Sequence, residues 1–509
     1  MSIQITNWGN VAKIVEKAAF HDERYGKVVI FTNANEWYIP TLVRNLHKSF
    51  SLYEPNHKLV VLCSDVEGYD MCKKIGYEYC AFINIPLLDV TDCKNLYDND
   101  KLFEKYTKLC FVKTVIMGHM LSSGYTPLYI DPDMSLKKPC IENLLQYLEN
   151  TEIVVSGYPD HINTNIMIAK PSSEGCKKMY SLSTWNVDET INLRLPGGDE
   201  PFTSTRILFI HKIPFVCVNK EDHPNGIDSQ IYKNSFTVHA NCTTGLENKI
   251  NLLKKCNSWY LPRVCIATLV IGNEFEVRYH KFFEQSHKNY AKRCNYEHKI
   301  ITHFLDLSRQ DTRLITMNKL LLCDQEWSND YDLIIILDGD IVINKSTPPI
   351  ECSYNLECDK IGVVCELSLD VQSEISFRSK IDDELPSEYY QKFLETSEKS
   401  SKLQHLINTG MLLAQPRKHG KILREIYDTH INTVLSQSKS YYSYEQAVVG
   451  YELQIRDLCV YLPNHWNAIW FFAKTFQNNI TMNEYLRKVY FLHLAGCCDH
   501  YDVPYLENE

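Results

Sequence analysis

A chain of 509 residues, of which 44% are hydrophobic and 23% charged, has the composition of a folded globular protein and is too long for one hydrophobic core. Its net charge of −10 excludes nucleic acid as the main partner, because phosphate binding requires a basic surface. No stretch approaches the roughly 18 apolar residues of a membrane span, and the N-terminal region lacks the apolar segment of a signal peptide. We therefore expect two domains, no membrane span and a cytoplasmic location.

The 19 cysteines are scattered through the whole chain. They form no Cys-x-x-Cys pair and show no spacing typical of a zinc site. We interpret them as free thiols in a reducing compartment rather than as a disulfide framework. This interpretation agrees with the cytoplasmic location.

The first half alternates strand-like and helix-like segments. Residues 27–32 are an apolar run that ends at Thr32, and residues 39–50 have a helical pattern. A second apolar run at 58–63 predicts the next strand, and a helix carrying Lys113 precedes a third strand that ends at Asp131-Pro132-Asp133. This alternation predicts an α/β fold with a mainly parallel, doubly wound sheet flanked by helices.

The second half repeats this plan. A strand at 263–270, which contains Thr268, is followed by a helix at 274–293, a helix with Lys319, and a strand at 333–337 before Asp338-Gly339-Asp340. The join falls between residues 250 and 263, and we place the domains at 1–255 and 256–509. An extra acidic stretch at about 367–406 predicts either an acceptor-recognition insert or a solvated surface helix.

The halves also share polar residues in the same order. Each has a lysine 18 or 19 residues before its Asp-x-Asp motif, an Asn-Thr pair after the motif, an acidic residue 36 or 37 residues past that asparagine, and a late histidine. One Asp-x-Asp motif is weak evidence, but an ordered set found twice predicts two copies of one catalytic architecture. The two sets are Lys113, Asp131, Asp133, Asn163, Asp199, Glu200 and His239, and Lys319, Asp338, Asp340, Asn408, Glu445, Gln446 and His493.

The paired acids predict a metal site in each half. Two carboxylates at a strand end offer hard oxygen ligands to Mg²⁺ or Mn²⁺, and an added imidazole favours Mn²⁺. The predicted ligands are Asp131, Asp133 and His239 in the first half and Asp338, Asp340 and His493 in the second. A metal held there neutralises a diphosphate and stabilises the charge that grows on a leaving nucleotide.

The remaining shared residues have predicted roles around the metal. Lys113 and Lys319 would add a second positive charge. The catalytic pairs, Asp199-Glu200 and Glu445-Gln446, would hold the acceptor hydroxyl or the donor sugar near the reacting carbon. Each of these side chains also has an ordinary interpretation as a solvated surface group.

The order of these motifs resembles that of metal-dependent glycosyltransferases of the GT-A fold over nearly the whole chain. The second half is similar to the family of fungal α-galactosyltransferases and plant xyloglucan xylosyltransferases, on the motifs at 337–340, 408–413 and 493–497. The first half is similar to nucleotide-diphospho-sugar transferases related to plant cell-wall xylosyltransferases and the glycogenin-like family. Its matching motifs are Asp131-Pro132-Asp133 and His239-Ala240-Asn241, followed by Gly245 and Lys249.

The resemblance implies two tandem GT-A-type, Rossmann-like domains. Their implied activity is sugar transfer from a nucleotide diphosphate, usually UDP, to a glycan or glycoprotein acceptor, with Mn²⁺ and retention of anomeric configuration. The sequence departs from the family pattern at two positions. Asn165 occupies a position where the pattern has glycine. No lysine in the second half matches Lys249, so His500 or a loop lysine would contact the phosphates there. The residues assigned to donor binding are Thr32, Lys113, Asn163, Lys249, Thr268, Lys319 and Asn408.

The leading interpretation is a bifunctional glycosyltransferase whose domains act in sequence on one growing glycan. An alternative has one active domain and one degenerate scaffold or acceptor-binding domain. A sugar-nucleotide pyrophosphorylase would need a glycine-rich, basic loop after its first strand, and residues 31–35 and 270–274 lack one. A purely structural carbohydrate-binding protein would not need the acids and histidine in both halves. The sequence does not specify the sugar, the acceptor linkage, the order of action or the oligomeric state.

Overall fold

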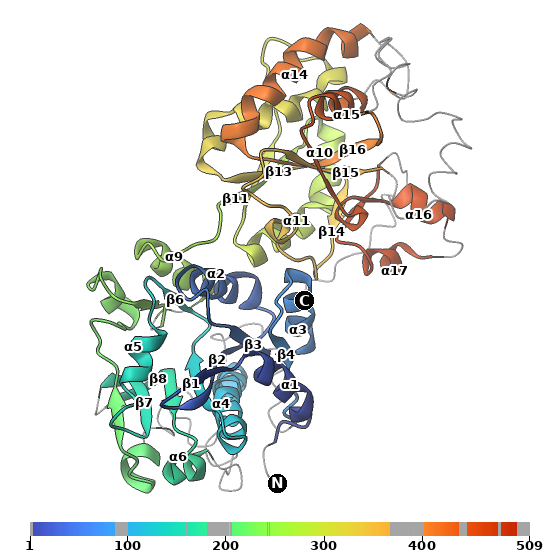
Figure 1. The fold of residues 1–509 in the computed structure, drawn as a ribbon. Helices are drawn as coiled ribbons and strands as arrows, with labels where there is room; N and C mark the ends of the chain where they lie inside the picture. Colours follow the sequence, from blue (N-terminus) through green and yellow to red (C-terminus); the bar gives the residue numbers. More distant parts are fainter. Residues whose placement is uncertain are drawn as a thin grey trace. The chain divides into compact units, whose positions relative to one another are not determined.

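The computed structural model describes residues 4–86, 100–158, 161–180, 203, 206–241, 243, 245–366, 390, 402–436, 445–476 and 480–495. The chain divides into two compact units, Met1–Leu261 and Pro262–Glu509, and each is described here by itself (Figure 1). Residues 256–261 lie with the first unit. There the Asn45 side-chain amide donates to the Ser258 carbonyl at 2.9 Å, and the Tyr260 N–H donates to Asn45 Oδ1 at 2.7 Å.

The first unit is built on an eight-stranded mixed sheet with the strand order β4-β3-β2-β5-β8-β7-β9, and β1 pairs with β2. The pairs β2–β3, β3–β4, β2–β5 and β7–β9 are parallel, whereas β8 runs antiparallel to both β5 and β7. The strands are β1 (Phe20–Asp22), β2 (Gly26–Ala34), β3 (Leu59–Cys63), β4 (Cys80–Phe82), β5 (Thr126–Ile130), β7 (Ile153–Tyr158), β8 (His161–Ala169) and β9 (Phe215–Cys217).

Helices cover both faces of this sheet, which explains why β3 and β5 are continuous apolar runs. One face packs Val29 and Phe31 against α1 and α4, and the other packs Val28 and Ile30 against α2 and α5. The helical segments are α1 (Trp8–Ala18), η1 (Ile39–Val43), α2 (Arg44–Tyr53), α3 (Val66–Ile75), α4 (Asp100–Ser122), α5 (Ile141–Gln146), α6 (Glu174–Met179), η3 (Arg206–Ile210), η4 (Gly226–Gln230) and α9 (Leu246–Lys255).

The second unit has a six-stranded sheet with the order β12-β11-β13-β16-β15-β17. The pairs β11–β12, β11–β13 and β15–β17 are parallel, and β16 runs antiparallel to both β13 and β15. The strands are β11 (Val264–Leu269), β12 (Glu297–Ile301), β13 (Leu333–Leu337), β15 (Ile361–Cys365), β16 (Ile407–Ala414) and β17 (Cys459–Leu462).

Helical segments surround this second sheet. Its two apolar clusters lie on opposite faces, one with Ile334 and Ile336 and the other with Leu333 and Ile335. The segments are α10 (Asn273–Phe282), α11 (Glu284–Cys294), η5 (Thr312–Leu314), η6 (Met317–Asp324), η7 (Glu326–Asp330), η8 (Ile350–Cys352), α14 (Pro416–Ser436), α15 (Glu445–Ile455), η9 (Asn464–Trp466), α16 (Trp470–Phe476) and α17 (Met482–Leu486).

The two sheets share one topology. The order β3-β2-β5-β8-β7-β9 of the first unit repeats as β12-β11-β13-β16-β15-β17 in the second, with the same direction at each pairing. Each unit also has a small sheet in which the strand after the acid motif pairs antiparallel with a late strand, β6 (Met134–Leu136) with β10 (Thr237–His239), and β14 (Ile341–Ile343) with β19 (Phe491–His493). In the second unit, β18 (Ala468–Ile469) also joins this sheet. The repeat in the sequence is therefore a repeat in the fold.

The predicted fold class is confirmed as α/β with mainly parallel sheets flanked by helices. The strands expected at 27–32, 58–63, 263–270 and 333–337 are β2, β3, β11 and β13. Two helix predictions are corrected. The helix expected at 274–293 is two helices, α10 and α11, which meet at Phe283, a residue buried in the same apolar cluster as Tyr279. Lys319 lies on a 3₁₀ helix.

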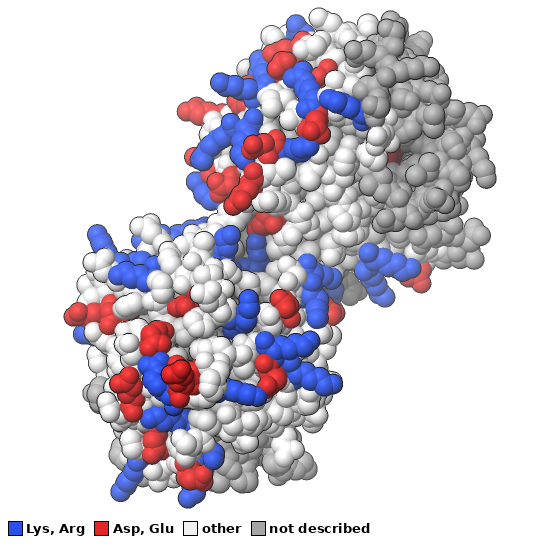
Figure 2. All heavy atoms as spheres, in the orientation of Figure 1, with Lys and Arg blue, Asp and Glu red and all other residues white. Residues whose placement is uncertain are grey.

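Other predictions meet the structure in part. Among residues 367–406, the structure describes Tyr390 and 402–406, so the predicted acidic insert lies largely outside the described residues. Every cysteine in the described ranges is a free thiol. No described helix combines the length and apolar character needed to cross a bilayer. On the face of each unit that Figure 2 draws, basic and acidic side chains are interspersed.

A buried histidine links α11 to the strand after the second acid motif. His287 is completely buried, its Nε2 donates to the Ile341 carbonyl at 2.8 Å, and its Nδ1 lies 3.1 Å from the Tyr279 hydroxyl. Burial lowers the pKa of His287 from 6.5 to about 3. The imidazole is therefore neutral in the folded unit and holds the backbone directly beside Asp340.

We expect the second unit to lose stability as pH falls below 6.5. In that range His287 binds a proton in the unfolded chain, whereas in the folded chain it stays neutral down to about pH 3. This contribution is fully present above pH 6.5. Below it, the free energy of unfolding should fall by up to about 1.4 kcal/mol per pH unit. Urea unfolding at several pH values between 7 and 5 measures the slope. His287→Gln should flatten the slope by about one proton, and an equally steep slope in that variant would refute the role of His287.

Candidate active sites

Both acid motifs begin where a central strand ends. Asp131 directly follows β5 and Asp338 directly follows β13. The neighbouring antiparallel strand fixes each backbone, because the Asp131 N–H donates to the Asn165 carbonyl at 2.9 Å and the Asp338 N–H to the Gly410 carbonyl at 2.8 Å. Asn165 and Gly410 therefore occupy equivalent positions in the two units.

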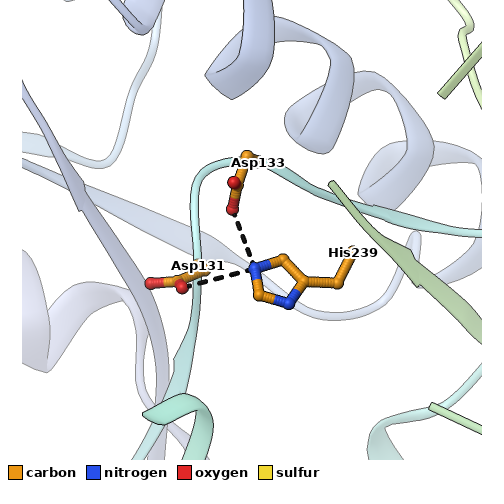
Figure 3. Close-up of side chains that lie close together, drawn as sticks. All are labelled: Asp131, Asp133 and His239. Carbon is orange, nitrogen blue, oxygen red and sulfur yellow. Dashed lines mark ion pairs between the residues drawn. The ribbon is translucent and has the colours of Figure 1, made fainter. Parts of the chain in front are cut away.

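In the first unit, the small sheet brings the late histidine to the acids. His239 pairs with Met134 in the β6–β10 register, and the Ala240 N–H donates to the Asp133 carbonyl at 3.1 Å. His239 Nε2 lies 3.1 Å from Asp133 Oδ1 and 3.5 Å from Asp131 Oδ2 (Figure 3). The ring is 2% exposed, so two carboxylates and an imidazole converge in a largely buried place.

Cationic side chains complete the first site. The Lys249 ammonium contacts Asp133 Oδ2 and donates to the Ala240 carbonyl at 3.0 Å, while Lys113 Nζ lies 3.7 Å from Asp131 Oδ1. The Tyr129 hydroxyl donates to the same Asp131 oxygen, and its ring lies 5.2 Å from Lys113 Nζ.

Opposing effects set the charge of these acids. Burial alone would raise the pKa of both carboxyls, but the neighbouring cations outweigh it. Lys113 and His239 hold the pKa of Asp131 below its usual value, and Lys249 and His239 hold the pKa of Asp133 far below it. Burial would lower the pKa of His239, and the two acids raise it instead. The first site is thus built for carboxylates in their charged form.

Three asparagines lie behind the first triad. Asn163 Oδ1 accepts from the Asn165 N–H at 3.0 Å, which fixes the strand backbone beside Asp131. Asn165 Nδ2 lies 2.8 Å from His239 Nδ1 and 2.9 Å from Asn225 Oδ1, and His239 Nδ1 lies 3.0 Å from the same Asn225 oxygen. The side chain that replaces the expected glycine therefore contacts the predicted metal-binding histidine.

The second unit assembles its triad in the same way. His493 pairs with Ile341 in the β14–β19 register, and the Leu494 N–H donates to the Asp340 carbonyl at 3.0 Å. His493 Nε2 lies 3.3 Å from Asp340 Oδ1. The ring packs directly on Gly410, where a Cβ atom would lie 2.3 Å from His493 Cε1. The glycine in the Asn-Thr-Gly motif is therefore a requirement for this position of the histidine.

A buried ion network joins Lys319 to two carboxylates. Lys319 Nζ lies 2.8 Å from Asp338 Oδ1 and 2.6 Å from Glu445 Oε1, and it donates to the Thr409 carbonyl at 3.0 Å. The Thr409 hydroxyl also donates to Glu445 Oε1 at 2.6 Å. Glu445 is 2% exposed, so its carboxylate is engaged with Lys319 rather than presented to solvent.

Burial affects these groups unequally. It would lower the pKa of Lys319, but Asp338 and Glu445 raise it, so the ammonium stays charged. Burial would raise the pKa of Glu445, and Lys319 lowers it instead. For Asp338 burial prevails over Lys319, and its pKa is raised. Without a bound cation, the second site therefore contains one carboxyl with a lowered pKa, Glu445, and one with a raised pKa, Asp338.

The second Asn-Thr pair connects to the predicted Glu-Gln pair. Asn408 Nδ2 donates to Gln446 Oε1 at 3.0 Å, and Asn408 Oδ1 accepts from the Gly410 N–H at 2.9 Å and from Asn467 Nδ2 at 2.7 Å. The start of α15 thus lies against the end of β16 beside the triad. Residues widely separated in sequence meet here as one hydrogen-bonded group.

For some predicted site residues, the structure describes no contact with either triad. Thr32 and Thr268 are completely buried inside β2 and β11, so neither side chain is presented to solvent. Asp199, Glu200 and His500 lie outside the described residues.

Sequence reasoning missed three residues that contact the sites. Tyr129 precedes Asp131 by two positions, and the two-residue period of a strand places such a pair on one side, so a signal existed. Asn225 and Asn467 have no such signal in the sequence. Both lie in loops, and only folding brings Asn225 near His239 and Asn467 near Asn408.

Both triads have the chemistry of a divalent metal site. Among the described residues, two groups of acids and histidines have ligand atoms within 4.8 Å of one another, and these are the two predicted triads. Two carboxylates and one neutral imidazole offer hard oxygen and borderline nitrogen ligands in each. The residues present therefore fit a cation that neutralises a diphosphate.

Several solved structures are similar to this chain. Similar solved structures include a glycosyltransferase involved in the glycosylation of the major capsid of PBCV-1 (13% identity, 47% of this chain and 97% of that one, TM-score 0.32). Mouse xyloside xylosyltransferase 1 is also similar (13% identity, 43% of this chain and 99% of that one, TM-score 0.30). So is the WbbM bifunctional glycosyltransferase (11% identity, 92% of this chain and 94% of that one, TM-score 0.31). Values this low carry no functional argument, and no curated protein matches.

A family match covers part of the first unit. Residues 56–253 match the family described as nucleotide-diphospho-sugar transferase. The matched segment contains the first triad, Lys113, Asn163 and Lys249. This match supports the prediction of a nucleotide-diphospho-sugar transferase for the first unit.

Proposed function

We propose that this chain is a bifunctional, metal-dependent glycosyltransferase that uses UDP-sugars as donors and a glycan or glycoprotein as acceptor. Each unit is one transferase domain in this proposal. The observation that carries it is the repeat of one site in two equivalent folds. In each unit, an Asp-Asp-His triad at the end of the corresponding strand is accompanied by a lysine from the preceding helical segment and an Asn-Thr pair on the neighbouring antiparallel strand.

The metal in this proposal is Mn²⁺, because each donor set contains an imidazole beside two carboxylates. When bound, it supplies positive charge that stabilises the departing diphosphate. Asp131, Asp133 and His239 would hold it in the first unit, and Asp338, Asp340 and His493 in the second. Lys249, which contacts Asp133 at the edge of the first triad, would bind donor phosphate oxygens there.

The residues beside each metal position orient the donor and acceptor. Asn163 and Asn408 would contact the donor sugar from the strand next to the acids. Gln446, which shares a hydrogen bond with Asn408, would position the sugar in the second unit. Lys319 would supply positive charge close to Asp338.

The surroundings of Glu445 support a retaining reaction in the second unit. An inverting transferase requires a carboxylate base within hydrogen-bond reach of the acceptor hydroxyl. Glu445 is buried and bound to Lys319 and Thr409, so we assign it a positioning role through Lys319. In a retaining reaction, the leaving phosphate itself can take the acceptor proton, and a free carboxylate base is not needed.

We expect an α-linked product from an α-linked UDP-sugar. A screen of UDP-sugars with Mn²⁺ identifies the donor, and NMR of the product gives its linkage. Gln446→Ala should lower kcat/KM by about 10- to 100-fold, because a misplaced sugar loses alignment with the acceptor. A β-linked product would contradict retention and would return the role of base to Glu445, or to Asp199 and Glu200.

One difference favours the alternative of a single active domain. Lys249 contacts Asp133 in the first unit, and no lysine occupies the matching place after the second histidine. In that alternative, the second unit would bind acceptor or serve as a scaffold. Transfer by the chain with the first triad removed separates the two functions, because a scaffold yields no product.

A further inference from the structure

Asn225 lies behind the histidine of the first triad. His239 directs Nε2 toward the two carboxylates, and its other ring nitrogen, Nδ1, lies 3.0 Å from Asn225 Oδ1 (Figure 3 shows the ring and the acids). Asn225 immediately precedes η4 and forms a backbone bridge with His239. Asn225 is therefore held against the ring by the main chain as well as by its side chain.

The proton on His239 can be located by its neighbours. A histidine binds a metal through a nitrogen that carries no proton, so the other nitrogen must carry it. Because Nε2 faces the acids, that proton belongs on Nδ1 when metal is bound, and Asn225 Oδ1 is the acceptor at hand. The contact is thus complementary to the metal-binding form of the ring.

Asn165 fixes which end of the Asn225 amide faces the ring. Its Nδ2 donates to Asn225 Oδ1 at 2.9 Å, and its own Oδ1 contacts the Ser156 hydroxyl. Asn165 is 1% exposed and Ser156 is completely buried. The Asn225 oxygen therefore faces both Asn165 Nδ2 and His239 Nδ1, and Asn165 Nδ2 also lies 2.8 Å from His239 Nδ1. In the metal-binding form of the ring, the Nδ1 proton points to the Asn225 oxygen, which is the acceptor of the two neighbours.

We propose that Asn225 is a positioning residue that accepts a hydrogen bond from His239 Nδ1 and so holds the ring in the orientation that binds the metal through Nε2. This inference rests on the proposed function, because it needs a metal in the first triad. Asn165, which contacts both His239 and Asn225, stands where the second unit has Gly410 under His493. The two units thus support their histidines in different ways.

The experiment measures Mn²⁺ affinity directly, by the loss of the free-ion EPR signal during titration of the full chain. A parent with Asp338→Ala and Asp340→Ala leaves the first triad as the metal site. In that parent, Asn225→Leu, which keeps the size but removes the acceptor, should weaken Mn²⁺ binding by about 10- to 100-fold. Asn225→Asp keeps an acceptor and should bind at least as tightly as the parent.

Two controls separate positioning from damage to the fold. Asn225→Ala adds no bulk and should weaken binding as Asn225→Leu does. In the opposite parent, with Asp131→Ala and Asp133→Ala, Asn225→Leu should leave the Mn²⁺ affinity of the second triad unchanged.

Each contrary result has a distinct meaning. Parent-like affinity in Asn225→Leu and Asn225→Ala would overturn the positioning role. Affinity lost equally in Asn225→Asp would also overturn it, because the acceptor would then be irrelevant. A parent that binds no Mn²⁺ would overturn the inference by removing the first metal site of the proposed function itself.

Discussion

Replacing Asp338 and Asp340 together with alanine should lower transfer by the second unit at least about 100- to 1000-fold and leave the first unit's product intact. The variant removes both carboxylates that would hold the metal, and with it the charge that stabilises the departing diphosphate. Mass spectrometry of the glycan product measures the result, because the sugar that the first unit adds and the sugar that the second unit adds are detected separately.

The matched control is the reciprocal pair, Asp131→Ala with Asp133→Ala. It should block transfer by the first unit while the second unit still transfers its sugar to an acceptor that does not need the first unit's product. Full product from the Asp338/Asp340 variant would refute a metal-dependent second site. Loss of both products from either variant would instead indicate one shared site.

Lys319→Met should cause the largest loss of stability among single substitutions at the sites. Lys319 is 3% exposed and pairs with the buried carboxylate of Glu445 and with Asp338, whose side chain is 33% exposed. Leaving a buried charge without its partner costs about 3–5 kcal/mol, which for a unit of this size lowers Tm by roughly 10 °C. Calorimetry of the full chain in the presence of EDTA measures the transition of the second unit.

Lys360→Met is the control for that substitution, because Lys360 also pairs with a carboxylate, Asp457, at 2.9 Å but on the surface. Exposed pairs contribute little, so its transition should stay close to that of the unchanged chain. If Lys319→Met melts at the same temperature as Lys360→Met, the buried network does not stabilise the second unit.

The sequence predicted the fold and the triads well because their signals are local. An apolar run that ends in Asp-x-Asp defines a buried strand and places both acids at its end, as β5 and β13 do. The histidines also had a local signal, a short apolar run before His239 and before His493. Their meeting with the acids could be expected because the same order occurs in both halves.

The helix predictions failed where packing overrides periodicity. Residues 274–293 have a continuous helical pattern, but the chain forms two helices, α10 and α11, that meet at the buried Phe283. The segment with Lys319 forms a 3₁₀ helix, and its ammonium meets Asp338 and Glu445, which come from distant parts of the chain. No local pattern encodes such an arrangement.

The hydrogen bonds behind the triads were beyond sequence reasoning for a similar reason. The sequence shows that Asn165 departs from the glycine of the pattern. Its side-chain contact with Asn225, 60 residues later, exists only in the folded chain. The sequence predicts that Glu445, beside Gln446, holds the acceptor hydroxyl or the donor sugar. Its pairing with Lys319 became evident only when the buried network was known.

The number of UDP molecules that one chain binds tests the central claim most directly. Calorimetric titration of the full chain with UDP in saturating Mn²⁺ should give two equivalents per chain and none in EDTA. The Asp131/Asp133 and Asp338/Asp340 alanine variants should each bind one equivalent. A single equivalent in the unchanged chain, or binding that is unaffected by both pairs of substitutions, would contradict an account in which each unit carries its own metal-dependent donor site.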